Sequence, residues 1–173
     1  MYSIFCTIIH LFTYLPAESA IAKNNLLATI PRLSAEWSIS FQFRQIGLVL
    51  GWTNLIRFGA SHEPFTSLSR IPAVFVRPNS TLLHFSTSIN GNRYNVDAEG
   101  TENKLNENHH AEIHQRYISK GDYSFFIEIN GIEIHSVINS EAQQFYDVHV
   151  YASDYYEENA AGYISNLLFT NFL

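Results

Sequence analysis

Two tyrosines, a carboxylate and an amide lie close together near the end of the chain. Asp154, Tyr155, Tyr156 and Asn159 all fall within an acidic segment, residues 154–161. A tyrosine offers a flat apolar ring with a polar tip, while carboxylates and amides bond to sugar hydroxyls. The segment is therefore the strongest candidate ligand-binding loop in the sequence. The alternative is that the tyrosines only cover the edge of a sheet.

Two glutamates flank an Asn130-Gly131 pair that is typical of a tight turn. In a hairpin, Glu128 and Glu133 stand opposite each other across this turn, and like charges so placed repel unless solvent or a cation intervenes. Oxygens of both glutamates and of the Asn130 side chain would suit Ca²⁺. This is the one cofactor that the sequence suggests, and a solvated hairpin tip is the other interpretation.

The same glutamates resemble the Glu-x-Asp-x-Glu core of laminarinase-type glucanases. A retaining glycosidase holds its two carboxyl groups roughly 5–5.5 Å apart across the bond that it cuts. Here a turn separates Glu128 from Glu133, and no aspartate lies between them. We therefore expect no catalytic residues in this chain and no enzymatic activity.

Three potential metal ligands alternate along a further segment. On a strand, His110, Glu112 and His114 project from one face, and imidazole with carboxylate is a donor set for a transition metal. On a helix the two histidines would instead be four residues apart on one face, although the strand fits better. The alternation also fits an ordinary outward face opposite Ala111 and Ile113.

These side chains need a framework, and its clearest part is a predicted β-hairpin over Tyr123–Val137. Asn130-Gly131 supplies the two residues that tolerate positive φ in a type I′ turn. Asn90-Gly91 predicts a second turn of this kind. Counting outward from Asn130-Gly131 gives two facing pairs of apolar residues, which share a face that we expect to be buried. These pairs are Ile129 with Ile132 and Ile127 with Ile134.

Strand patterns recur through the rest of the chain. Trp37–Arg44 alternates apolar and polar residues without error, which indicates a half-buried strand. The polar stretch Asp97–Asn108 lacks an apolar pattern and indicates a surface loop. Further predicted strands are short apolar runs bounded by turn residues, and the first of them, ended by Pro31, suits a sheet edge. They cover residues 25–30, 52–58, 70–76, 81–88, 111–118, 145–152 and 162–172.

Nine to twelve short strands with turns between them, and no sustained period of 3.6, predict an all-β fold. An antiparallel two-sheet β-sandwich, or jelly roll, is the architecture that suits this pattern. A chain of 173 residues with 46% hydrophobic residues is large enough to bury the core of one such domain. No second domain is needed.

Six segments match a known family in order and pattern. They are Glu36–Phe41, Trp52–Phe58, Arg70–Ala73, Tyr123–Gly131, Val148–Asp154 and Gly162–Leu167. Together they resemble a laminin G-like, concanavalin A-like lectin/glucanase jelly roll over about residues 25–172. The resemblance implies two curved sheets and an extracellular module that binds glycans or proteins, sometimes through calcium. Galectins share the sandwich, and His84-Phe85 resembles their sugar-binding strand.

The first residues differ from the rest. Tyr2–Leu15 is mostly apolar and uncharged, and Ala20-Ile21-Ala22 has small residues at the spacing that signal peptidase recognises. We predict a signal peptide over residues 1–22 and a single β-sandwich domain over residues 23–173. The alternative for this segment is a first strand or an apolar arm.

Secretion would have two chemical consequences. Cleavage removes Cys6, the only cysteine, so the mature domain would hold together by its core without disulfides. Asn79 begins an Asn-x-Ser/Thr sequon, formed with Ser80 and Thr81, that would be open to glycosylation in a eukaryotic secretory pathway.

The charge distribution narrows the choice of partners. The formal charge is −6, and the ten lysines and arginines are scattered singly, so no basic stripe exists to bind a phosphate backbone. We expect no nucleic acid partner and no membrane span in the mature chain.

The predicted function is a secreted, non-enzymatic recognition or adhesion module that binds glycan or protein through rim loops. The alternatives are a concanavalin A-like glycoside hydrolase and a purely structural extracellular matrix component.

Overall fold

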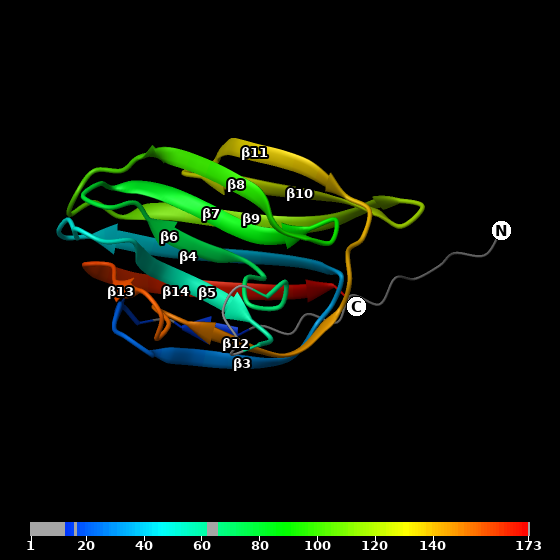
Figure 1. Cartoon of the computed structure of the whole chain (residues 1–173), viewed down its shortest axis with the longest axis horizontal. Helices are drawn as coiled ribbons and strands as arrows, with labels where there is room; N and C mark the ends of the chain where they lie inside the picture. Colours follow the sequence, from blue (N-terminus) through cyan, green and yellow to red (C-terminus); the bar gives the residue numbers. More distant parts are fainter. Residues whose placement is uncertain (1–12, 16, 62–65, 173) are drawn as a thin grey trace.

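A computed structural model of the chain describes residues 13–15, 17–61 and 66–172. All regular elements among these residues are strands, and no helix occurs among them. The strands form two seven-stranded sheets, and Figure 1 shows the second sheet, with β5 to β8, in front of the first. The predicted all-β antiparallel sandwich is confirmed.

The first sheet has the strand order β1-β14-β4-β9-β10-β11, with β2 paired to β14. Every pair in it is antiparallel. Its strands are β1 (Thr13–Leu15), β2 (Ser19–Ala20), β4 (Glu36–Gln45), β9 (His109–Ser119), β10 (Asp122–Ile129), β11 (Ile132–Asn139) and β14 (Gly162–Phe172).

The second sheet has the order β3-β12-β5-β6-β7-β8, with β13 paired to β5. The β13–β5 pair is parallel, and the others are antiparallel. Its strands are β3 (Leu26–Leu33), β5 (Thr53–Gly59), β6 (Ala73–Val76), β7 (Leu82–Ile89), β8 (Asn92–Glu102), β12 (Phe145–Tyr151) and β13 (Glu158–Asn159).

The core lies between the sheets and comes from alternate residues of each strand. β4 follows the predicted period of two, because every second residue from Trp37 to Gln45 is buried. By contrast, β5 is buried along its whole length, so its outward side chains are covered as well. The largest core side chains are Trp37, Phe41, Phe43, Phe58, Phe85, Phe125 and Phe169.

Both Asn-Gly turns form as predicted. Asn130 and Gly131 have φ of +51° and +75° between β10 and β11, and Asn90 and Gly91 have +50° and +68° between β7 and β8. Two successive positive φ values are the signature of a type I′ turn. These dipeptides therefore determine where two of the hairpins reverse.

The predicted pairing of the β10–β11 hairpin is correct only beside the turn. Ile129 faces Ile132 as expected, but a bulge between Ile127 and Glu128 places Ile127 opposite His135 instead of Ile134. Ile132 is 68% exposed, so the expectation that it is buried was wrong. The reason is that β11 is the last strand of its sheet, and an edge strand has a neighbour on one side only.

Two strand boundaries also differ from the prediction. Asp97–Asn108 is not all loop, because β8 runs on to Glu102 and pairs with β7. β8 ends its sheet, and main-chain hydrogen bonds hold an edge strand without an apolar pattern. β3 also continues through Pro31 to Leu33. An edge strand tolerates proline on the side that has no neighbour.

Most of the predicted signal peptide, Cys6 included, lies outside the described residues. In the described part, β1 and β2 pair with β14, and Ile21 is a core residue only 6% exposed. Cleavage after Ala22 would remove these elements, and the signal peptide stays a prediction. Across the described part of the chain, no helix is long and apolar enough to cross a membrane.

Candidate functional site

The predicted binding loop crosses the outer face of the second sheet. It connects β12 to β14 and includes β13, which pairs with Thr53 and Asn54 of β5. Asp154, predicted as a ligand, is buried. Its main-chain N–H donates to Asn54 Oδ1 at 3.2 Å, and its Oδ1 accepts from the N–H of Tyr156 at 2.9 Å. Asp154 therefore anchors the loop and is not presented to solvent.

An arginine completes this anchor. Arg57 Nη1 lies 3.4 Å from Asp154 Oδ2, and both side chains are 4% exposed. The Arg57 guanidinium also donates to the carbonyl oxygens of Ser69 at 2.6 Å and Ser61 at 2.7 Å. A buried charge needs such partners because its removal from water is costly. The contacts join β5, the loop after it and the binding loop into one unit.

The other predicted loop residues are more accessible. The ring centroids of Tyr155 and Tyr156 lie 4.0 Å apart, and the hydroxyl of Tyr155 donates to that of Tyr156 at 2.7 Å. The Tyr156 ring also lies over the Arg57 guanidinium, 5.6 Å from centroid to Cζ. Asn159 is exposed on β13, and its Oδ1 accepts from Ser153 Oγ at 3.3 Å. The structure thus brings the two tyrosines together, whereas the Asn159 side chain bonds to Ser153.

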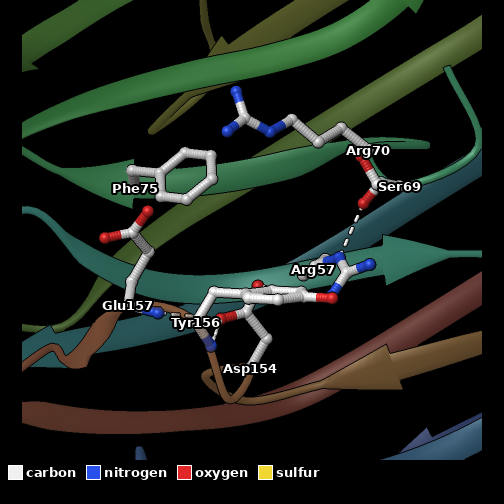
Figure 2. A pocket seen from close by; sticks show the side chains of 7 residues that line it. All are labelled: Arg57, Ser69, Arg70, Phe75, Asp154, Tyr156 and Glu157. Carbon is white, nitrogen blue, oxygen red and sulfur yellow. Dashed lines mark hydrogen bonds and ion pairs between the residues drawn. The ribbon is translucent and has the colours of Figure 1, made fainter. Parts of the chain in front are cut away.

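Beside this loop the outer face of the second sheet is hollowed. A cavity of about 230 Å³ is lined by Trp52, Arg70, Phe75, His84 and Glu157. A smaller hollow next to it shares Arg70, Phe75 and Glu157, and extends to Tyr156 and Arg57. Figure 2 shows this second part, with Tyr156 across Arg57 and the Glu157 carboxylate beside the Phe75 ring. We call the two hollows together the outer groove.

Aromatic side chains from β6, from β7 and from the residue before β5 form one wall of the outer groove. Trp52 directly precedes β5, and Phe75 on β6 pairs with His84 on β7. The His84 ring meets Trp52 edge to face at 5.1 Å and 70°, and the Arg70 guanidinium lies 4.9 Å from the Phe75 centroid. Trp52 remains 39% exposed. The groove therefore presents an accessible indole ring beside polar groups.

Glu157 contributes a carboxyl group to both hollows of the outer groove. Burial raises the pKa of its carboxyl group above the ordinary value, repulsion from Asp154 raises this pKa further, and Arg70 lowers it. Arg70 also donates from Nη1 to Ser86 Oγ at 3.0 Å. A carboxyl group and a guanidinium at the same hollow can accept from and donate to the hydroxyls of one ligand.

Sequence reasoning missed most of this groove. It placed Trp52, Arg70 and Phe75 in strands as fold residues, and noted His84 only for its likeness to a galectin strand. A usable signal existed, because side chains on a strand alternate between faces. His84 lies between the core residues Leu83 and Phe85, so its side chain had to face outward, as an aromatic ring on a polar face.

The predicted calcium ligands lie on the other sheet. Glu128 and Glu133 face each other as expected. Asn130 Oδ1, however, accepts from the N–H of His110 at 2.9 Å. This bond directs the amide toward β9, on the opposite side of β10 from Glu133. The structure thus brings the two glutamates together and turns Asn130 away from Glu133.

Two predicted sites remain, the glycosylation sequon at Asn79 and the alternating metal ligands of β9. Asn79 is exposed in the turn between β6 and β7, with φ of +50°, and its N–H donates to the Val49 carbonyl at 2.7 Å. Its side chain therefore stands where a glycan would have room.

His110, Glu112 and His114 alternate on β9 as predicted and lie on its outward face, opposite the buried Ala111 and Ile113.

Comparison with known proteins supports the fold and leaves the family open. No protein-family model and no curated protein matches the chain. Several solved structures do match. A carbohydrate-binding module, CBM66 from Bacillus subtilis, has a TM-score of 0.51 and 14% identity, covering 91% of this chain and 97% of its own. The concanavalin A-like jelly roll is therefore shown, and the laminin G-like family is not.

Enzymes share this fold as well. The alginate lyase Aly36B, solved as a mutant with an alginate tetrasaccharide, has a TM-score of 0.57 and 11% identity over 90% of this chain and 80% of its own. A Trypanosoma rangeli sialidase in complex with sialic acid has a TM-score of 0.55 and 9% identity over 80% of this chain. The chain spans only 21% of that sialidase.

The prediction that the chain is not an enzyme was wrong. It relied on the turn between Glu128 and Glu133, which excludes one glucanase arrangement. The matching structures include a lyase and a sialidase alongside a non-catalytic module, and a fold hosts many unrelated activities. The absence of one motif therefore gave no ground to exclude catalysis.

Proposed function

We propose that the protein binds carbohydrate in the outer groove. The observation that carries this proposal is the exposed indole of Trp52 above a cavity that also holds Arg70 and Glu157. A sugar ring has an apolar face, which stacks on an aromatic side chain, and a rim of hydroxyls, which bond to charged and polar groups. The groove offers both types of contact within one hollow.

The shared fold supports this proposal. The matching structures include a carbohydrate-binding module and an alginate lyase solved with an alginate tetrasaccharide. At 11–14% identity these matches concern the fold alone. The proposal therefore depends on the groove of this chain and its own side chains.

A glycan array tests the proposal directly. Full-length protein is compared with Trp52→Ala, and Leu50→Ala serves as a matched control because Leu50 is nearby and 86% exposed. We expect Trp52→Ala to weaken binding to the best glycan by about tenfold or more, which is about 1.4 kcal/mol. Leu50→Ala should bind like the unchanged protein.

Two results would overturn the proposal. One is an empty array for a well-folded protein, which would direct the search to extracellular protein partners. The other is a glycan signal that Trp52→Ala leaves intact, which would place the sugar elsewhere. Chromatography of the best glycan after long incubation shows, in the same experiment, whether bound sugar is also cut.

We also propose that the protein is secreted, on the strength of its apolar first residues and the exposed sequon at Asn79. Expression in eukaryotic cells tests this proposal. The protein should appear in the medium, and N-terminal sequencing gives the cleavage site. An endoglycosidase should lower its mass, and Asn79→Gln should abolish that shift. Retention of the full chain inside the cells would contradict the proposal.

A further inference from the structure

A cluster of three possible metal ligands lies on the first sheet. Glu112, His114 and Glu128 each offer one ligand atom, and these atoms all lie within 4.8 Å of one another. Glu112 and His114 are on β9, and Glu128 faces Glu112 from β10. The cluster thus differs from both metal sites that the sequence suggested, since it takes residues from each. It also lies on the opposite sheet from the outer groove.

The histidine is held in a suitable orientation. Its Nδ1 lies 2.8 Å from Ser38 Oγ on β4, and its ring stacks on Phe126 at 4.6 Å and 19°. In the tautomer with the proton on Nδ1, this nitrogen donates to Ser38 Oγ, and the lone pair of His114 Nε2 is available to a metal ion in place of the hydrogen bond with Glu112. Metal-binding histidines are usually oriented in this way by a hydrogen bond from the other ring nitrogen.

The Glu112 carboxylate is also held in place, by contacts with two imidazoles. Glu112 Oε2 lies 3.1 Å from His114 Nε2, and its other oxygen lies 3.2 Å from His110 Nδ1. His110 Nε2 in turn lies 3.0 Å from Ser40 Oγ. Both imidazoles beside Glu112 are therefore fixed by serine hydroxyls of β4, so the ligand atoms start from a fixed arrangement.

The cluster carries an excess of negative charge. Glu112, Glu128 and Glu133 lie side by side across β9, β10 and β11. Glu128, the middle one, forms no ion pair with any residue in the described part of the chain. Like charges directly opposite each other destabilise a sheet. A hydrogen bond between His114 and Glu112 leaves this repulsion in place, whereas a bound cation removes it.

We propose that Glu112, His114 and Glu128 bind a divalent transition metal ion, with zinc as the preferred ion. Zinc accepts both imidazole nitrogen and carboxylate oxygen, and the cluster offers one imidazole nitrogen and two carboxylate oxygens. Three protein ligands leave a fourth position open to water or to a ligand. Calcium fits less well, because it takes six to eight oxygen ligands and His114 supplies a nitrogen.

Zinc titration of EDTA-treated full-length protein by calorimetry tests this site. We expect one zinc ion per chain, and at least about tenfold weaker binding in Glu128→Gln and in His114→Ala. Ser38→Ala should weaken zinc binding by about 10- to 100-fold, as loss of an orienting hydrogen bond does. His149→Ala is the matched control, because His149 lies on β12 of the other sheet, and it should bind zinc normally.

Glu128→Gln keeps the size of the side chain, so this variant should fold even where His114→Ala does not. Cobalt provides a second measurement, since its visible absorption should show a four-coordinate site in the unchanged protein and not in Glu128→Gln. The proposal is overturned if zinc binds no more tightly than about millimolar, if the variants bind it equally well, or if calcium binds more tightly than zinc. Each outcome is independent of sugar binding in the outer groove.

Discussion

Arg57 and Asp154 form a buried ion pair that connects the centre of the second sheet to the loop that covers it. The two residues are 97 positions apart in the sequence. The pair holds the loop in the position from which Tyr156 and Glu157 reach the outer groove. The shape of the outer groove therefore depends on the buried ion pair between Arg57 and Asp154.

Loss of the Arg57–Asp154 ion pair should make the folded protein less stable. We expect Asp154→Ala to lower the free energy of unfolding by about 3–5 kcal/mol, because it leaves the Arg57 charge buried without its partner. Urea denaturation measures the change. Glu107→Ala is the control, since Glu107 pairs with Lys104 at an exposed site, where an ion pair contributes about 0–1 kcal/mol. Equal losses in both variants would show that the buried pair is not needed.

A glycine at the start of β14 should resist substitution. A Cβ atom at Gly162 would overlap the Arg44 carbonyl oxygen, whereas one at Gly47 would meet Ala161 Cβ at an ordinary 3.6 Å. We expect Gly162→Ala to destabilise the protein by about 1–3 kcal/mol through overpacking. Gly47→Ala should be nearly neutral. Thermal melting distinguishes the two, and matching melting temperatures would contradict the expected clash.

Glu157 should make stability depend on pH. Its pKa is raised in the folded protein, so the folded state keeps this proton at a pH where the unfolded chain has lost it. Folded protein then binds more protons, and the free energy of unfolding falls as the pH rises from the unfolded pKa to the folded pKa. Above the folded pKa, Glu157 is ionised in both states, and its effect on the free energy of unfolding no longer changes with pH.

The variant Glu157→Gln has no proton to lose at this position. Its free energy of unfolding, relative to the unchanged protein, should therefore increase as the pH rises from about 4.3, the ordinary pKa of a glutamate, toward neutral pH. Urea denaturation of both proteins over this range gives the difference, in which the other titrating groups cancel. A difference that stays constant with pH would rule out a raised pKa at Glu157.

The first described residues should contribute to stability. A chain that begins at Lys23 lacks β2 and Ile21, whereas one that begins at Ala17 keeps both. We expect the shorter chain to be less stable by at least about 1.5–3 kcal/mol, the value of burying one large aliphatic side chain. Ile21→Ala in the longer chain should reproduce much of this loss. Equal stability of both chains would show that a domain cleaved after Ala22 is complete without them.

Features that depend on neighbours in the sequence could be predicted. The alternation of Trp37–Arg44 identified the core face of β4, because side chains of a strand point to opposite faces in turn. The Asn90-Gly91 and Asn130-Gly131 pairs located two hairpin turns, because positive φ is a local preference. Together these patterns were sufficient to predict the all-β sandwich, although not the bulge at Ile127 or the length of β8.

The candidate sites required the tertiary structure. Tyr155 and Tyr156 lie together in one loop. Nothing in the local sequence distinguishes them from Asp154, which is buried in an ion pair with Arg57. Trp52, Phe75 and His84 meet only because β5, β6 and β7 pair in one register. In the same way, Glu128 joins His114 across a strand pair. Burial and strand register come from contacts between distant segments, so the sequence determined the fold class while packing decided which side chains share a site.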